Sequence, residues 1–143
     1  RAIKALRAAP LEELGLLPAL RQLAGDAAER GGFQVAVTLP ESLQRLVPEV
    51  ENDLYRVAVE GFENIVRHAA ASQVELRLEA RGAALELDLS DNGRGFDPAA
   101  VEKSGHFGLI GLRERAARHG ARLEITSQPG KGTRIRFSVE TSK

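Results

Sequence analysis

Two polar side chains in the longest expected helix have the types and the spacing of a ligand site. Glu60 and Asn64 stand one helical turn apart in LYRVAVEGFENIVRHA, on an arc that also holds Arg56 and Arg67. A carboxylate can act as a base or orient a water molecule, and an amide oxygen can ligate a hard cation. Because Mg²⁺ commonly takes only one or two protein oxygens, Asn64 alone would suffice for a magnesium site. From the helix alone, a solvated face with i,i+4 charge pairs is the favoured interpretation.

A second candidate stretch is LSDNGRGFDP, in which Asp91 ends an alternating segment and Gly93 and Gly95 follow. Asn-Gly favours a tight turn, so a hairpin tip is one interpretation. Glycines also permit close approach of a planar or charged ligand, and an aspartate at a strand end can accept a hydrogen bond from the exocyclic amine of a purine. The five residues from Asp91 to Gly95 alone leave both interpretations open.

Two further glycine clusters follow along the chain. GHFGLIGL, with Gly105, Gly108 and Gly111, opens directly into an expected helix, whose N-terminal amides can bind phosphate oxygens. Its glycines also suggest a mobile flap. It is neither the GxGxxG fingerprint nor a GxxxxGK[ST] phosphate loop. PGKGTRIRF adds a glycine turn followed by Thr133, whose hydroxyl could reach a ligand from the sheet.

Composition excludes several kinds of site. The chain has 143 residues and a formal net charge of zero, which disfavours broad electrostatic binding to nucleic acid or to an anionic membrane. The absence of cysteine excludes disulfides and thiolate catalysis. The histidines show no metal-ligand spacing, and no apolar run approaches the ~20 residues that cross a bilayer. Because the sequence starts at Arg1 and contains no methionine, we expect it to be a piece of a longer protein.

The elements that must position these residues can be read from periodicity. Helices are expected over residues 1–14, from about 18 to 30 with Gly31-Gly32 as its end, from about 48 to 71, and over 109–119 with Gly120 as its end. The core face of the long helix is expected to hold Leu54, Ala58, Gly61, Phe62 and Ile65. Alternating apolar residues predict strands at 33–39, 74–78, 85–89, 123–125 and 135–139. This order favours an α/β sandwich with one sheet covered on one face by helices.

Taken in order, the four stretches resemble the N, G1, G2 and G3 boxes of the gyrase, heat-shock chaperone, histidine kinase and MutL ATPase superfamily. The matching pattern is Glu60/Asn64, Asp91-x-Gly93-x-Gly95, Gly108-x-x-Gly111 and Gly130-x-Gly132-Thr133, over about residues 33–140. LYRVAVEGFENIVRHAAAS is most similar to the N box of sensor histidine kinases that pair with helix-turn-helix response regulators. LEELGLLPALRQLAGDAAERGGFQV resembles their junction between dimerisation helices and catalytic domain, which extends the resemblance to nearly the whole chain.

The resemblance implies a Bergerat-type ATP-binding fold with a mixed, mostly antiparallel sheet. Residues 1–16 would be the C-terminal remnant of a dimerisation helix and its linker, and residues 17–143 the ATP-binding catalytic domain. Asn64 would ligate Mg²⁺, Glu60 is the candidate catalytic base or polariser, and Asp91 would bind the adenine amino group. The remaining nucleotide contacts are expected from Gly93 and Gly95 around adenine, Thr133 at the adenine end, Gly108, Leu109, Gly111 and Leu112 at the phosphates, and Arg67 and His68 on the phosphate side.

The implied activity is that of an ATP-dependent protein histidine kinase in two-component signal transduction. The domain would bring Mg²⁺-ATP to a histidine on a dimerisation helix that is not in this chain. None of His68, His106 and His119 has the neighbouring acidic residue of such a phosphoacceptor. We therefore expect this stretch to bind ATP or ADP without phosphorylating itself.

Its expected partners are the dimerisation and phosphoacceptor domain of the parent protein and the response regulator of that parent, with no nucleic acid and no membrane contact. We expect a cytoplasmic monomer from a homodimeric parent, which is either soluble or anchored in the inner membrane. Same-fold alternatives are an anti-sigma-factor serine kinase or an ATP-hydrolysing module, which the PLEELGLLPAL junction disfavours. An interaction module without nucleotide is disfavoured by the intact Asn64, Asp91 and glycines.

Overall fold

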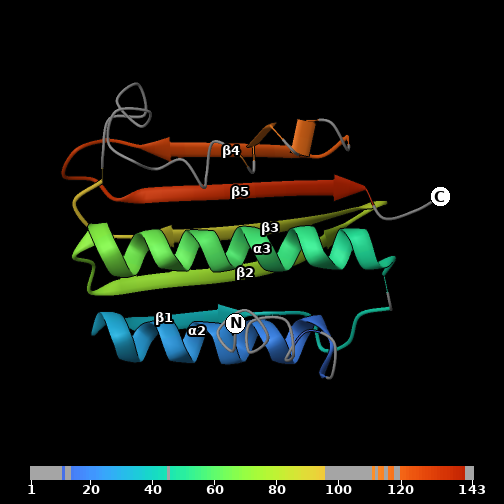
Figure 1. The fold of residues 1–143 in the computed structure, drawn as a ribbon, viewed down its shortest axis with the longest axis horizontal. Helices are drawn as coiled ribbons and strands as arrows, with labels where there is room; N and C mark the ends of the chain where they lie inside the picture. The colour runs from blue at the N-terminus through green and yellow to red at the C-terminus, as the bar shows by residue number, and fades with distance from the viewer. Residues whose placement is uncertain are drawn as a thin grey trace.

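Apolar residues at every second position form a five-stranded sheet, and helices with an apolar stripe cover one of its faces (Figure 1). The computed structural model describes residues 11, 14–44, 46–95, 111, 113, 114, 116, 117 and 120–140. In chain order the elements are α2 (Leu16–Gly31), β1 (Gln34–Thr38), α3 (Pro48–Asn64), a π-helical turn (Ile65–Ala69), β2 (Gln73–Arg81), β3 (Ala84–Asp91), β4 (Arg122–Ser127) and β5 (Thr133–Glu140).

The strands lie in the order β1-β2-β3-β5-β4. β1 pairs with β2 in parallel, and the pairs β2–β3, β3–β5 and β4–β5 are antiparallel. Both α2 and α3 lie on the same face (Figure 1). The prediction of a mixed, mostly antiparallel sheet covered on one face by helices is therefore confirmed.

The core lies between the helices and the apolar side of the central strands. All five residues that periodicity assigns to the core face of α3 and its extension are buried. They pack among fully buried side chains of α2, β2, β3 and β5, which include Leu20, Leu76, Leu87 and Phe137. Because side chains alternate along a strand, this apolar layer fixes the register of the sheet.

The opposite face of the sheet is polar and pairs its charges across strands. Arg134 Nη2 lies 2.6 Å from Asp88 Oδ2, and Arg136 Nη2 lies 3.1 Å from Glu86 Oε2. Both ion pairs are diagonal in the β3–β5 ladder, where Asp88 lies opposite Arg136 and Glu86 lies opposite Ser138. The charged face is thus largely neutralised by its own neighbours.

The predicted ends of α2 are confirmed. Gly15, with φ 88°, precedes the helix, and Gly32 closes it in the left-handed conformation with φ 71°. Of the helices expected over residues 1–14 and 109–119, most residues lie outside the described part of the chain; those described are helical, and Gly120 has the expected positive φ of 74°. Among the described helices, none has both the length and the apolar character needed to cross a membrane.

The predicted end of the long helix is wrong. The helix begins at Pro48, but its regular α-helical part ends at Asn64 instead of continuing to about Ala71. Ile65–Ala69 form a π turn, and Ala70 adopts a left-handed φ of 53°. Apolar periodicity continues through this segment without a glycine or proline, so the sequence pattern carries no signal for the change. π turns inside helices frequently mark functional sites.

The end of α3 faces the place where β3 ends and β5 begins (Figure 1). Asp91, the last residue of β3, pairs in the ladder with Thr133, the first residue of β5. The sheet register therefore sets two of the candidate site residues side by side, opposite the helix that carries a third, Asn64.

Candidate functional site

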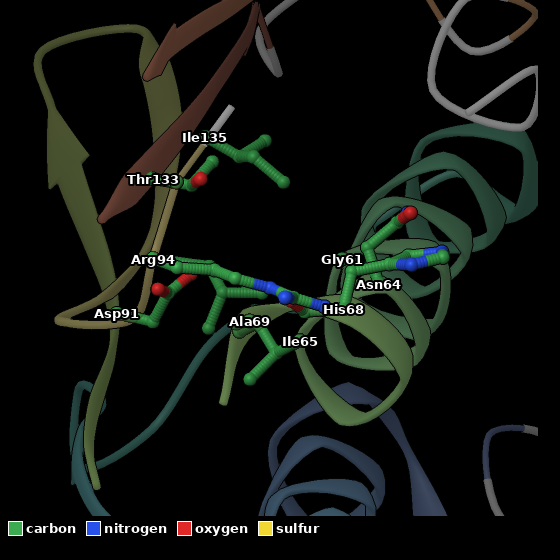
Figure 2. Close-up of a pocket in the computed structure, with 11 residues that line it drawn as sticks. Gly61, Asn64, Ile65, His68, Ala69, Asp91, Arg94, Thr133 and Ile135 are labelled. Atoms are coloured by element: carbon green, nitrogen blue, oxygen red, sulfur yellow. The ribbon is translucent and has the colours of Figure 1, made fainter. Parts of the chain in front are cut away.

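A cavity of about 180 Å³ lies between the last turns of α3 and the adjoining ends of β3 and β5 (Figure 2). Its polar lining consists of Asn64, His68, Asp91, Arg94 and Thr133. Its apolar lining consists of Gly61, Ile65, Ala69, Leu89, Gly95 and Ile135. An apolar cavity with a few convergent polar groups is the usual form of a small-molecule site.

Gly61 lets the helix approach the sheet closely at this cavity. A Cβ at this position would lie 2.5 Å from Leu89 Cδ2 and 3.3 Å from Ile135 Cδ1. Sequence periodicity places Gly61 on the core face, and the structure adds that its missing side chain sets the spacing between α3 and the strands that carry Asp91 and Thr133.

Asp91 presents a half-buried carboxyl group to the cavity. Its Oδ1 accepts a hydrogen bond of 2.7 Å from the Gly93 amide. Burial raises the pKa of the Asp91 carboxyl, and hydrogen bonds from the Gly93 and Thr133 amides oppose that rise. The group is thus a desolvated, backbone-anchored acceptor, which suits recognition of a ligand amine.

Asn64 is held by its own helix. Its Nδ2 donates a hydrogen bond of 2.8 Å to the main-chain oxygen of Glu60, one turn earlier. That bond uses the donor end of the amide and leaves Oδ1 as the group available to a ligand. An amide oxygen fixed in this way fits a hard cation such as Mg²⁺.

The Asp91–Gly95 loop is tied to the segment that follows Asn64. Asn92 Oδ1 accepts hydrogen bonds from the amides of Ser72 (2.9 Å) and Gln73 (3.0 Å), and Asn92 Nδ2 donates to Ser72 Oγ (3.0 Å). The Arg94 amide donates to the Ala69 oxygen at 2.8 Å. Sequence reasoning treated Asn92 only as a turn former, because nothing in DNG indicates a partner twenty residues earlier in the chain.

The glycines of this loop give clearance first of all to the chain itself. A Cβ on Gly93 would collide with the main-chain oxygen of Ala69, and one on Gly95, whose φ is 65°, would collide with that of Gln128. In the glycine turn, Gly132, with φ 79°, lies equally close to the Asp91 carbonyl. Of the two loop glycines that were expected to shape the ligand pocket, Gly95 lines the cavity directly, whereas Gly93 allows the loop to dock on the π turn.

The Thr133 hydroxyl is oriented by a neighbouring serine. Ser127 Oγ donates to the Gly132 oxygen at 3.1 Å and lies 2.7 Å from Thr133 Oγ1. Because Ser127 has one hydroxyl hydrogen and directs it at Gly132, the Thr133 hydroxyl donates to Ser127 and can offer its lone pairs to a ligand.

The structure thus brings together around one cavity five residues that the sequence singled out: Asn64, His68, Asp91, Gly95 and Thr133. Glu60 is half-buried one turn before Asn64, and Arg67 is exposed and lies 3.7 Å from Glu63; neither belongs to the described lining. Gly111 is exposed and is also not among the lining residues. Gly108, Leu109 and Leu112 lie outside the described residues. Arg94 lines the cavity without having been predicted as a site residue.

Comparison with known proteins gives one family for this arrangement. Residues 49–143 match the family model described as histidine kinase-, DNA gyrase B-, and HSP90-like ATPase. The signal transduction histidine-protein kinase/phosphatase DegS of Brevibacillus brevis is 34% identical over 139 residues, which cover 97% of this chain and 36% of DegS. The sensor histidine kinase MctS of Rhizobium johnstonii is 39% identical over 124 residues, which cover 85% of this chain and 27% of MctS.

A solved structure shares the fold. The histidine kinase domain of the blue-light activated histidine kinase from Erythrobacter litoralis EL346 superimposes with a TM-score of 0.71 at 24% identity, covering 86% of this chain and 59% of that one. The chain spans about a third of the length of the curated relatives that it matches.

Proposed function

This chain belongs to the family of histidine kinase-, DNA gyrase B- and HSP90-like ATPases as an ATP-binding catalytic domain of the histidine kinase type, and we propose that it supplies Mg²⁺-ATP for phosphorylation of a histidine in its parent protein. The acceptor histidine would lie on a dimerisation helix outside this chain. The parent would then be a homodimeric sensor kinase that passes the phosphoryl group to a response regulator in the cytoplasm.

One observation carries the proposal: Asn64 and Asp91, which belong to separate elements, line the same cavity from opposite sides (Figure 2). A carboxylate acceptor on the strand side suits the amino group of adenine, and an amide oxygen on the helix side suits a phosphate-bound cation. A nucleotide that satisfies both must extend from the strand ends towards the end of α3.

On this proposal, the side chains of the cavity bind and orient the nucleotide. Asp91 accepts from the adenine amine, Thr133 adds an acceptor beside it, and Ile65, Leu89 and Ile135 offer apolar surface to the ring. Asn64 would hold Mg²⁺, which neutralises charge on the phosphates. Glu60, half-buried one turn before Asn64, is the proposed base or polariser. Phosphoryl transfer demands mainly positioning and charge stabilisation, which such a site supplies.

The remaining predicted contacts stay within the proposal. Gly108, Leu109, Gly111 and Leu112 would cradle the phosphates, and Arg67 and His68 would lie on the phosphate side. His68 lines the cavity, which supports its part directly. That the matched relatives DegS and MctS are histidine kinases favours this activity over a serine kinase of the same fold.

Titration calorimetry tests the proposal. We expect the domain to bind ATP or ADP, with an affinity that falls when EDTA removes Mg²⁺. Asn64→Ala should lose chiefly the metal-dependent part, while the affinity measured in EDTA stays close to that of the unsubstituted domain. Absence of nucleotide binding with Mg²⁺ present, or an equal loss with and without the metal in Asn64→Ala, would contradict the assignment.

A further inference from the structure

Arg94 connects three segments that surround the cavity. Its Nε donates a hydrogen bond of 2.6 Å to the His68 main-chain oxygen, and its amide donates to that of Ala69. Its own carbonyl accepts a hydrogen bond of 2.5 Å from the Gly130 amide in the glycine turn before β5. A helix leaves its last carbonyls without intrahelical partners, so Arg94 satisfies two groups at the end of the helix that carries Asn64.

The side chain of Arg94 spans the cavity. Figure 2 shows it running from the loop beside Asp91 across to the turn at His68. Among the described residues no carboxylate forms an ion pair with it, whereas each arginine of the strands β2, β4 and β5 has one. The interaction that the structure gives for this side chain is the hydrogen bond to the His68 carbonyl.

The main-chain hydrogen bonds of residue 94 do not depend on its side chain. The hydrogen bond to the His68 oxygen, in contrast, requires a donor at the Nε position. It joins the loop that follows Asp91 to the turn that follows Asn64. Both partners are exposed, so the bond contributes little to overall stability and chiefly fixes the relative position of the two segments.

We propose that Arg94 is a positioning residue that couples the base end of the nucleotide site to its metal end. By holding the π turn against the Asp91–Gly95 loop, it keeps Asn64 where a cation on the phosphates of an Asp91-bound nucleotide can reach it. This inference rests on the proposed function, since it concerns binding of the same Mg²⁺-nucleotide.

Three substitutions separate the hydrogen bond from the charge. In Arg94→Gln, the amide Nε2 stands the same number of bonds from the backbone as the arginine Nε, so the donor is kept and the charge is removed. Arg94→Lys keeps the charge but places a methylene group at that position. Arg94→Ala removes both. Arg122→Gln, at an exposed arginine that pairs with Glu124 on the opposite face of the sheet, is the matched control.

The measurement is the ratio of affinities for a non-hydrolysable ATP analogue with Mg²⁺ and with EDTA, obtained by calorimetry. We expect Arg94→Gln and Arg122→Gln to keep the ratio of the unsubstituted domain within about twofold, and Arg94→Ala and Arg94→Lys to lower it by roughly five- to tenfold, the size of a typical coupling between sites. Adenosine, which engages only the base end, should bind all four variants nearly equally. A general loss of structure would instead weaken adenosine and nucleotide alike.

A double variant completes the test. Asn64→Ala already removes the metal end, so adding Arg94→Ala to it should cause no further loss in Mg²⁺. If the double variant lost as much additional affinity in Mg²⁺ as Arg94→Ala loses alone, the inference would be overturned. It would also be overturned if Arg94→Lys kept the Mg²⁺/EDTA affinity ratio while Arg94→Gln lowered it. Either result would assign Arg94 a direct charge contact with the nucleotide. An unsubstituted domain without Mg²⁺-dependent binding would overturn the proposed function as well, whereas normal binding with an intact ratio in Arg94→Ala would overturn this inference alone.

Discussion

The half-buried Asp91 carboxyl affects the stability of the domain, and on the proposed function it also affects nucleotide binding. Burial raises the pKa of its carboxyl, so the folded chain holds the proton more tightly than the unfolded chain does. The protonated carboxyl therefore contributes to the free energy of unfolding. This contribution is fully present below the pKa that Asp91 has in the unfolded chain, and it is lost as the pH rises through the pKa that Asp91 has in the folded chain. At neutral pH the ionised Asp91 therefore costs stability, which a bound amine would offset.

Asp91→Asn should weaken nucleotide binding without unfolding the domain. The amide oxygen can still accept from the Gly93 amide, but an amide nitrogen can face the adenine amine as a second donor. A hydrogen bond to a charged group contributes about 1.5–3 kcal/mol, so ATP affinity should fall by roughly 10- to 150-fold. The melting temperature of the nucleotide-free variant should stay equal or rise. Unchanged affinities for both ATP and GTP would remove Asp91 from adenine recognition.

The pH dependence of adenosine binding should carry the titration of Asp91. On the proposed function, adenine recognition would need the ionised Asp91 carboxylate, and burial places the pKa of this carboxyl above its ordinary value. Affinity should therefore decrease as the pH falls towards and through that raised pKa. Adenosine is the appropriate probe because it has no phosphate to titrate, and Asp91→Asn supplies the reference for protonation of the base. NMR titrations that give parallel pH profiles for the two domains would contradict this assignment.

At the scale of the elements, the glycines of the loop hold the sheet and the helix end together. Gly93→Ala would direct a methyl group at the main-chain oxygen of Ala69, where only movement of backbone can relieve the contact. We expect a loss of roughly 1–3 kcal/mol in the free energy of unfolding, as for other overpacked positions. Nucleotide affinity should fall as well, because the same contact docks the Asp91 loop on the π turn.

Gly25→Ala is the matched control for this substitution. Gly25 lies inside α2 with nothing within 4 Å of an added Cβ, so alanine there should stabilise the domain by roughly 0.5–1 kcal/mol. Urea unfolding of Gly93→Ala and Gly25→Ala measures the free energy of unfolding of each variant. A Gly93→Ala domain as stable as the parent would show that the loop and the π turn are not rigidly docked.

The elements also show what the sequence could and could not predict. Alternating and helical periodicities were enough for the strands, the buried face of α3 and the start of that helix at Pro48, because burial is a local property of the pattern. The end of α3 was missed because a π turn keeps the apolar spacing. The bonds from Asn92 to Ser72 and from Arg94 to His68 were missed because they join residues far apart in sequence. Nothing local to DNGRG indicates which backbone it will cap.

For the molecule as a whole, the site lies at one end of a two-layer domain whose exposed sheet face is self-paired. The helix-facing side supplies the core, and the ends of α3, β3 and β5 supply the cavity (Figures 1 and 2). The curated relatives are about three times as long as this chain, and on the proposed function the acceptor histidine would lie elsewhere in the parent protein. Nucleotide binding by this domain and phosphoryl transfer to the histidine should therefore be measurable separately.

That separation gives a test of the complete activity. Incubated with γ-labelled ATP and Mg²⁺, this domain alone should retain no label, because none of its three histidines has the acidic neighbour of a phosphoacceptor. Adding the dimerisation domain of the parent protein should yield label that is stable to base and labile to acid, as a phosphohistidine is. Substituting Asn64→Ala in the catalytic domain should abolish this transfer, since on the proposed function the Mg²⁺ that neutralises the phosphates would no longer be held. Label on the catalytic domain itself, or on a serine of an added protein, would instead favour a serine kinase on the same fold.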